Sequence, residues 1–428
     1  MHLRTALSAV LLASLSFSQS PAGDWVLSID HQGERVISTR AQLSAAEGKL
    51  SGKAANASLR GTADGSAVTI EWLRPNGTVE ATLTGKIDGA SMSGTAVNFE
   101  GLTYNWTAER EPAPRPPARH EFTPTAFQRY FSPTTKPVLR IHPGDTVSTW
   151  SVDAGGTDPS DKRRSLGGNP LTGPFYVESA LPGDTLVVRF NKVRTNRDWA
   201  GSGTGIVSNA VSPDYSANLK RADGFSGRWT LDAANKTATL AKPTEALKKF
   251  TVPLEPMIGC VAVAPAGQEV VSTRDSGRFG GNMDYNRIRE GTTVYLPVFQ
   301  PGALLLVGDG HAAQGDGELT GDALETSMDI EFTVDVIRNF ATGMPFAEDS
   351  EYWMAIGIAG SLDDALRRAT TGMARYLELE HGLNSNEAAV VLGFAVKYDV
   401  ADLVGTQVSI VAKLPKAIIN QLPPRKKR

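Results

Sequence analysis

The chain has 428 residues, of which 21% are charged, and its formal net charge is −3. A chain of this length exceeds what one compact core usually holds, so we expect two or three domains. The nearly balanced charge argues against nucleic acid or an anionic lipid surface as a partner. Cys260 is the single cysteine, which excludes an intrachain disulfide.

Residues 1–18 have the pattern of a secretory signal peptide. Arg4 precedes an apolar run from Ala6 to Leu15, and small residues follow at Ser16 and Ser18. The apolar run is too short to span a bilayer, and no later stretch reaches the roughly 18 to 20 apolar residues that a spanning helix needs. We therefore expect an exported protein, periplasmic or extracellular, without membrane insertion.

Residues 24–110 predict a small all-β domain, either a meander or a barrel. Two alternating segments, Val68–Leu73 and Val79–Leu83, flank Pro75-Asn76-Gly77-Thr78, which is typical of a tight hairpin. A short motif that ends in glycine recurs along the region, at Gly52, Gly61, Gly85 and Gly94. No polar cluster stands out within these strands, which favours a packed accessory domain over a ligand-holding barrel.

A proline-rich stretch, 111–119, separates this region from the rest of the chain. It cannot join a helix or a central strand, so it predicts a linker. Residues 120–422 then form the expected second domain, and the basic segment 423–428 predicts a solvated tail.

Strand and helix patterns in 120–422 indicate a mostly β structure with helices near its end. Pro-Gly-Asp turns at 143–145 and 182–184 each precede a β-branched run. The segment 328–336 alternates apolar and polar residues, as an amphipathic strand does. Apolar residues recur at helical spacing over 361–380, and a second helix is expected over 385–397.

The densest group of chemically active side chains lies at Gly308–Glu318, after the apolar strand expected at Ala303–Val307. Carboxylate, imidazole and amide groups alternate there with very small residues. A divalent cation is bound by this mixture of oxygen and nitrogen donors. A polar surface turn is the alternative, but His311, Gln314 and Glu318 between apolar strands favour a functional site.

A second group lies at Gly280–Asp284. Its glycines allow a tight turn with exposed N–H groups, and Asn282 and Asp284 could bind a ligand or orient a neighbour. Taken alone, the segment also fits a structural glycine turn.

Several motifs, spread over residues 120–420, closely resemble those of the acetamidase/formamidase family. They are His142–Asp145, Asn169–Val177, Pro182–Leu186, Met257–Cys260, Gly280–Asp284 and Gly291–Glu318. The resemblance implies hydrolysis of short amides to carboxylate and ammonia. It also implies a jelly-roll-like β-sandwich with a smaller α+β part, and a homo-oligomer. The signal segment and the N-terminal β domain depart from the plainer members of the family.

Hydrolysis of an amide requires a strong nucleophile, charge stabilisation at the carbonyl oxygen and a proton for the leaving nitrogen. A bound divalent cation lowers the pKa of water to about 7 and so supplies the nucleophile. We expect zinc, with calcium as the alternative. The candidate metal ligands are Asp153, Asp309, His311 and Asp316. The candidate general base is Glu318, with Glu325 as the alternative. The candidate substrate-binding residues are Asn282, Asp284, Gln314 and His142.

Other chemistries have less support. The sequence contains no Gly-x-Ser-x-Gly motif and no serine and lysine constellation, so a serine acyl-enzyme is not expected. Cys260 lies in an apolar run that predicts a buried strand, where thiols are usually inert. The alternative function is an exported small-molecule or carbohydrate binding protein whose amidase-like domain is not catalytic.

Overall fold

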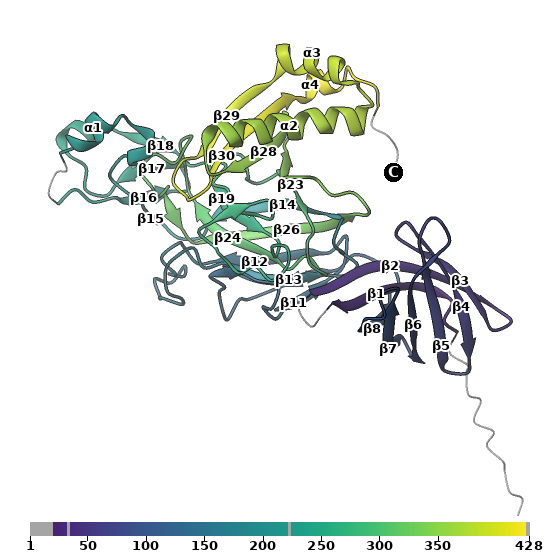
Figure 1. Cartoon of the computed structure of the whole chain (residues 1–428). Helices are drawn as coiled ribbons and strands as arrows, with labels where there is room; N and C mark the ends of the chain where they lie inside the picture. Colours follow the sequence, from purple (N-terminus) through teal and green to yellow (C-terminus); the bar gives the residue numbers. More distant parts are fainter. Residues whose placement is uncertain (1–19, 32–34, 221–223, 425–428) are drawn as a thin grey trace, which may run out of the picture. The chain divides into compact units, whose positions relative to one another are not determined.

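The computed structural model describes residues 20–31, 35–220 and 224–424. The chain divides into two compact units, Met1–Glu111 and Pro112–Arg428 (Figure 1). The expected signal peptide lies outside the described residues, as does most of the expected basic tail. Over the part of the chain that is described, no helix is long and apolar enough to cross a membrane.

The first unit is a closed barrel of eight antiparallel strands in sequence order. The strands are β1 (Gly23–His31), β2 (Arg35–Ala46), β3 (Lys49–Ala54), β4 (Ala57–Asp64), β5 (Ala67–Leu73), β6 (Val79–Asp88), β7 (Ser91–Asn98) and β8 (Thr103–Arg110). The predicted hairpin is confirmed, because β5 and β6 pair across the Asn76-Gly77 turn. Trp25 and Trp106 lie buried in the interior, which is filled by apolar side chains.

The recurring glycines of the barrel lie where neighbouring strands approach closely. A Cβ atom at any of the four positions would lie 1.9 to 2.2 Å from a backbone carbonyl oxygen of the next strand. Such a distance is far shorter than van der Waals contact, so only glycine fits. The repeated motif therefore reflects strand packing.

Two large sheets form most of the second unit. One has the strand order β29-β30-β28-β27-β23-β14-β26-β12-β9. Its strands are β9 (Arg119–Glu121), β12 (Thr146–Ser151), β14 (Thr185–Thr195), β23 (Thr293–Pro297), β26 (Met328–Ile337), β27 (Phe346–Glu348), β28 (Tyr352–Ala359), β29 (Lys397–Asp402) and β30 (Val408–Pro415).

The other sheet runs β18-β17-β16-β15-β25-β24-β19-β22-β21, and β13 pairs with both β24 and β11. Its strands are β11 (Leu139–Ile141), β13 (Thr172–Val177), β15 (Trp199–Gly201), β16 (Arg228–Asp232), β17 (Thr237–Leu240), β18 (Thr251–Pro253), β19 (Met257–Ala262), β21 (Ser276–Gly277), β22 (Gly280–Asn282), β24 (Leu305–His311) and β25 (Glu325–Thr326). A small sheet pairs β10 (Tyr130–Phe131) with β20 (Val271–Ser272).

The main core lies between the two large sheets. It combines buried residues of β14 and β26 with those of β13, β19 and β24, including Phe190, Phe332 and Phe175. Strand β26 alternates buried and partly exposed positions, which confirms the predicted amphipathic strand. The chain is therefore mainly β, as expected, with a smaller α+β part at its C-terminal end.

The helices near the C-terminus pack on the part of the first large sheet that contains β28 and β30. Helix α2 (Leu362–His381) packs against β28 and β30 (Figure 1). The Ser361 side chain accepts a hydrogen bond from the Asp364 N–H, as the predicted helix start requires. Helix α3 (Ser385–Ala395) ends before the expected Lys397, because Lys397 begins β29. The remaining helices are α1 (Pro213–Ala217) and α4 (Lys416–Ile419), with 3-10 turns at Ser208–Ala210 and Glu245–Leu247.

The two glycine-containing groups differ from the expected loops. Gly308–His311 continues the buried strand β24, and Gly280–Asn282 forms β22. A Cβ atom at Gly310 would lie 2.6 Å from the Cβ atom of Met328, and one at Gly308 would lie 2.9 Å from Leu171. These glycines therefore allow a central strand to pass close to its neighbours. The segment resembled a loop in the sequence because it is rich in glycine and aspartate.

Candidate active site

Five acidic or imidazole side chains from the predicted segments meet at one end of β24. Asp309 and His311 lie on β24, Asp284 follows β22, Glu318 lies in the loop after β24, and Glu325 begins β25. Two groups of possible metal ligands share the imidazole: Asp284, His311 and Glu318, and Asp309, His311 and Glu325. Within each group the ligand atoms lie within 4.8 Å of one another. They line a cavity of about 90 Å³, and we call these five residues the acidic cluster.

The imidazole of His311 faces the carboxylates through its Nε2 atom. That atom lies 3.1 Å from Oε1 of Glu325, 3.6 Å from Oδ1 of Asp309 and 4.0 Å from Oδ1 of Asp284. Its Nδ1 atom lies 2.8 Å from Oε1 of Gln314. Gln314 donates through Nε2 to the backbone oxygens of Asp284 and Ala401, which can only accept, so its Oε1 accepts the Nδ1–H of His311. Gln314 thereby turns Nε2 into the cluster.

Two asparagines hold the carboxylates in place. The amide of Asn169 donates to Oδ2 of Asp309 at 2.9 Å and to Oδ1 of Asn282 at 2.7 Å. Asn282 in turn donates to Oδ2 of Asp284. This chain of hydrogen bonds satisfies one oxygen of each aspartate and leaves the other facing the cavity.

The backbone of the site is unusual. Asp284, Asp309, Glu318 and Asn169 all have positive φ angles, between 42° and 60°. Residues with side chains seldom adopt this left-handed region, and such residues concentrate at functional sites. Gly259 of β19 lies beneath the cluster, since a Cβ atom there would lie 2.4 Å from Oδ1 of Asp284 and 2.8 Å from Oδ2 of Asp309.

Burial of several carboxylates together changes their protonation. Burial raises the pKa of Glu318 to about 8, with further increases from Glu325 and Asp309 and a partial decrease from His311. Burial likewise raises the pKa of Glu325 to about 7, against the lowering effect of His311. Burial also raises the pKa of Asp284. For His311, burial disfavours the charged ring, but Glu325 and Asp309 outweigh it and raise its pKa.

The chemistry of the cluster fits a divalent cation. Among the described residues, Oδ1 of Asp284, Oδ1 of Asp309 and Oε2 of Glu325 are buried without a hydrogen-bond partner. Buried carboxylate oxygens are costly unless they are paired or bind a metal. Three oxygens and an imidazole nitrogen that face one small cavity are donors suited to zinc, and the oxygens also suit calcium.

The structure does not bring three of the predicted site residues to the cluster. The carboxylate of Asp153 lies 2.7 Å from the guanidinium of buried Arg197 and also accepts the N–H of Thr157. Asp316 is exposed and accepts a hydrogen bond from Asn286. The backbone N–H of His142 donates to Asp145, and its side chain does not line the cavity.

Other residues near the cluster were not singled out from the sequence. Asn169 and Gly259 belong to family-like motifs, but neither had an assigned role. Arg274 lines the cavity and brings a cation to it. Burial raises the pKa of Asp402 to about 6, against hydrogen bonds from Val404 and Gly405, and its charge contributes to the raised pKa of Glu318. Asp402 lies at the end of β29, more than 80 residues after Glu318, and no local sequence pattern indicates that it belongs to the site.

Cys260 is buried next to the cluster, as its apolar run predicted. Burial raises the pKa of its thiol, and the charges of Asp309 and Asp284 raise it further. A thiol with a raised pKa is a poor nucleophile. The interpretation of Cys260 as a structural residue therefore agrees with its surroundings.

An apolar cavity of about 570 Å³ adjoins the acidic cluster through Glu318, which lines both cavities. Its walls include Trp229, Leu240 and Phe250 from the β16–β18 region. Glu318 therefore lies between a polar cavity and an apolar one.

Comparison with known proteins points to one family. The model of the acetamidase/formamidase family matches residues 204–421. A predicted acetamidase/formamidase from the thermophile Thermoanaerobacter tengcongensis aligns with 72% of this chain and 98% of its own, at 27% identity and a TM-score of 0.60. An acetamidase from Bacillus halodurans aligns with 71% of this chain and 99% of its own, at 26% identity and the same TM-score.

A sequence relative gives the same result over a shorter region. A Schizosaccharomyces pombe protein named for formamidase activity is 26% identical over an alignment of 217 residues, and the match covers 40% of this chain. The match spans about half, 52%, of that relative's length. The family model covers half of the present chain, and the structural relatives align over nearly their whole length. The chain therefore belongs to the acetamidase/formamidase family.

Proposed function

We propose that the protein hydrolyses the carbon–nitrogen bond of small amides, releasing a carboxylate and ammonia at the acidic cluster. The observation that carries the proposal is the convergence of Asp284, Asp309, His311 and Glu318 on one cavity of about 90 Å³. A cavity of this size suits an amide as small as formamide or acetamide. The names of the relatives, acetamidase and formamidase, agree with this substrate class.

The residues that would hold a divalent cation are Asp284, Asp309 and His311. Oδ1 of each aspartate is buried and free of hydrogen bonds among the described residues, and Nε2 of His311 faces both. A cation at this position would supply Lewis acidity, which would polarise a carbonyl group and lower the pKa of water.

Glu318 is the proposed general base. Its pKa of about 8 lies in the range in which a carboxylate can both accept and return a proton near neutral pH. It lines the polar cavity and the apolar one, so it can reach a substrate that enters from either side. Glu318 would take a proton from the attacking water and deliver it to the leaving nitrogen.

Other groups position the substrate. Asn169 and Arg274 line the cavity, and Arg274 offers a cation to the carboxylate product. Asn282 also lines the cavity and donates to Asp284, while Gln314 bonds to His311, so both would orient the proposed ligands. Oε1 of Glu325 lies 3.1 Å from Nε2 of His311, so Glu325 is the proposed ion-pair partner of that imidazole.

The test is ammonia release from formamide, acetamide and propionamide, with and without a chelator. We expect activity that is lost when metal is removed and that returns when zinc is added. Activity that persists after verified complete removal of metal would reject the metal-dependent mechanism alone. An absence of ammonia from every amide would reject the amidase and favour the exported binding protein.

Export is proposed because residues 1–18 have the pattern of a signal peptide. Self-association is proposed because the family resemblance implies it. Fractionation of cells that express the full chain would test export, and light scattering of the purified protein would give its subunit number. We expect a processed N-terminus after residue 18 and a homo-oligomer.

A further inference from the structure

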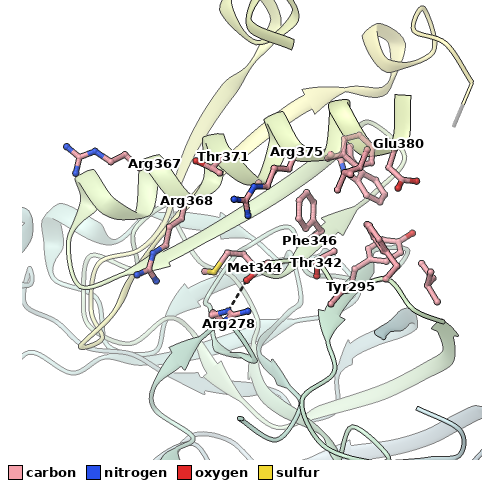
Figure 2. Close-up of a pocket in the computed structure, with 18 residues that line it drawn as sticks. Arg278, Tyr295, Thr342, Met344, Phe346, Arg367, Arg368, Thr371, Arg375 and Glu380 are labelled. Atoms are coloured by element: carbon pink, nitrogen blue, oxygen red, sulfur yellow. Dashed lines mark hydrogen bonds between the residues drawn. The ribbon is translucent and has the colours of Figure 1, made fainter. Parts of the chain in front are cut away.

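A second large cavity lies away from the acidic cluster, between α2 and the strands β23, β27 and β28 (Figure 2). Its volume is about 610 Å³, within the usual range for sites that bind small organic molecules. None of its lining residues also lines the cavity of the acidic cluster. We call it the α2 cavity.

One wall of the α2 cavity is aromatic. The rings of Trp353 and Tyr376 stack with their centroids 4.6 Å apart, and Phe346 lies within 6.2 Å of each. Buried Met344 also lines the cavity. Such a wall is suited to the apolar body of a ligand, because aromatic and thioether groups offer large, polarisable contact surfaces.

The remaining lining residues are strongly basic. Four arginines and one glutamate, Glu380, line the cavity, so it carries a net positive charge. In Figure 2 the side chains of Arg368 and Arg375 extend from α2 towards Arg278 and Met344, whereas Arg367 points away. The excess charge is therefore directed into the space beside the aromatic wall.

The inward-facing arginines are not neutralised by carboxylates within the described residues. Arg278 donates its Nε–H to the backbone oxygen of Gly343 at 3.1 Å, and Arg368 donates to that of Ile358 at 2.7 Å. Arg375 has neither a hydrogen bond nor an ion pair over the same part of the chain. A guanidinium has five N–H donors, so most donors of this group are available to a ligand.

A polar group without a partner adds to this arrangement. The hydroxyl of Thr342 lines the cavity and is buried, and it has no hydrogen-bond partner among the described residues. Buried hydroxyl groups usually have a partner, and one without a protein partner next to a basic cavity fits a ligand that can accept a hydrogen bond.

We propose that the α2 cavity binds an organic carboxylate with an aromatic or medium-chain apolar body. Its carboxylate would lie among Arg278, Arg368 and Arg375, since the planar guanidinium fork matches a carboxylate bidentately. Its body would cover Trp353 and Tyr376. An inorganic anion would leave the apolar part of the cavity unfilled, and a neutral apolar molecule would leave the arginines without a counter-charge.

The test is calorimetric titration of the full chain with 4-phenylbutyrate, with 4-phenylbutanol as the neutral analogue and sulfate as the inorganic anion. We expect 4-phenylbutyrate to bind at least about tenfold more tightly than the alcohol, because charge-assisted hydrogen bonds distinguish the two. Equal affinity for acid and alcohol would overturn the proposal. So would competition by sulfate at concentrations similar to that of the acid.

Two variants locate the binding. Arg375→Ala removes an exposed guanidinium that has no partner among the described residues, so the fold should persist while affinity falls at least about tenfold. Arg194→Ala is the matched control, because that exposed guanidinium pairs with Glu290 and does not line the cavity. It should change affinity less than twofold. Equal affinity of the two variants would overturn the proposal.

A third variant fills the cavity and leaves every arginine in place. Thr371 lines the cavity from the exposed face of α2, so Thr371→Trp should block it and abolish binding of 4-phenylbutyrate. Unchanged affinity in this variant, with the helical circular dichroism of the parent protein, would place the ligand elsewhere and contradict the proposal.

Discussion

Nδ1 of His311 lies 2.8 Å from Oε1 of Gln314, and this contact fixes which imidazole nitrogen faces the carboxylates. The amide of Gln314 is oriented by its donation to the backbone oxygen of Asp284, so its oxygen must face the ring. A hydrogen bond of this kind at the outer nitrogen of a histidine orients the inner nitrogen for a metal.

Replacement of Gln314 tests this orientation. Gln314→Leu removes the acceptor, so we expect metal affinity and turnover to fall by about 10- to 100-fold while the fold persists. Metal titration of the purified variant beside its rate would measure both. The control is Gln300→Leu, since Gln300 also donates to backbone carbonyls, those of Pro265 and Gly267, but does not line the cavity of the cluster. An equal loss in the control would show a general packing effect.

Gly259 gives a steric test. A Cβ atom at this position would lie 2.4 Å from Oδ1 of Asp284 and 3.0 Å from the ring of His311, so Gly259→Ala must displace both. We expect the loss of bound metal and of nearly all activity, and a decrease in stability of about 1 to 3 kcal/mol. Gly360→Ala is the control, because nothing lies within 4 Å of a Cβ atom there. Full activity of Gly259→Ala would contradict the geometry of the cluster.

Asp153 distinguishes a structural carboxylate from a metal ligand. Its partner Arg197 has only 2% of its side chain exposed, so Asp153→Asn leaves a buried guanidinium without its counter-charge. Loss of one member of a buried ion pair typically costs about 3 to 5 kcal/mol. We expect a marked decrease in the free energy of unfolding, measured by denaturant titration, with metal content retained. Loss of metal without loss of stability would restore Asp153 to the ligand set.

The ionisation of Asp145 should make the free energy of unfolding depend on pH. Burial would raise its pKa, but hydrogen bonds from Arg115, the N–H groups of His142 and Ala118, and His120 outweigh burial and hold its pKa below the ordinary value. The ionised carboxylate is therefore favoured in the folded state, and its stabilising contribution is complete above about pH 4 and is lost as the pH falls further.

The corresponding variant is Asp145→Asn, compared with Asp335→Asn at an exposed strand position. Asp145→Asn should lower the thermal midpoint at pH 7 and should make it less sensitive to acid between about pH 4 and pH 2. Thermal unfolding at several pH values would show this. If the thermal midpoint of both variants fell in acid as steeply as that of the parent protein, the ionised Asp145 would not stabilise the fold through its contacts with Arg115 and the neighbouring backbone.

The sequence predicted those elements whose local pattern matches their burial. The hairpin at Asn76-Gly77, the amphipathic strand β26 and helix α2 all form where expected, because each is amphipathic and begins or ends at a recognisable turn or cap. Strand β24 was less predictable beyond Val307. Residues 308–311 are buried and the two glycines among them allow close packing, so this part of the strand lacks the alternating or β-branched pattern typical of a strand.

The site was predictable in its centre and less so at its edges. Asp309, His311 and Glu318 are close in sequence and meet in space, and Glu325 and Asp284 join them across adjacent strands. Asn169 and Asp402 come from distant segments, and only the tertiary fold brings them near. Asp153 pairs with Arg197 in the structure, and a lone aspartate in the sequence gives no local sign of that partner.

Glu318 is proposed to transfer protons during amide hydrolysis at a metal site held by its neighbours. The most direct measurement is ammonia release from acetamide beside metal content, for the parent protein, Glu318→Gln and His311→Ala, with circular dichroism as the check of folding. We expect Glu318→Gln to retain metal while its rate falls about a hundredfold or more, and His311→Ala to lose both metal and rate. A near-normal rate for Glu318→Gln, or loss of its metal as complete as that of His311→Ala, would show that Glu318 is not the base and make Glu325 the next candidate.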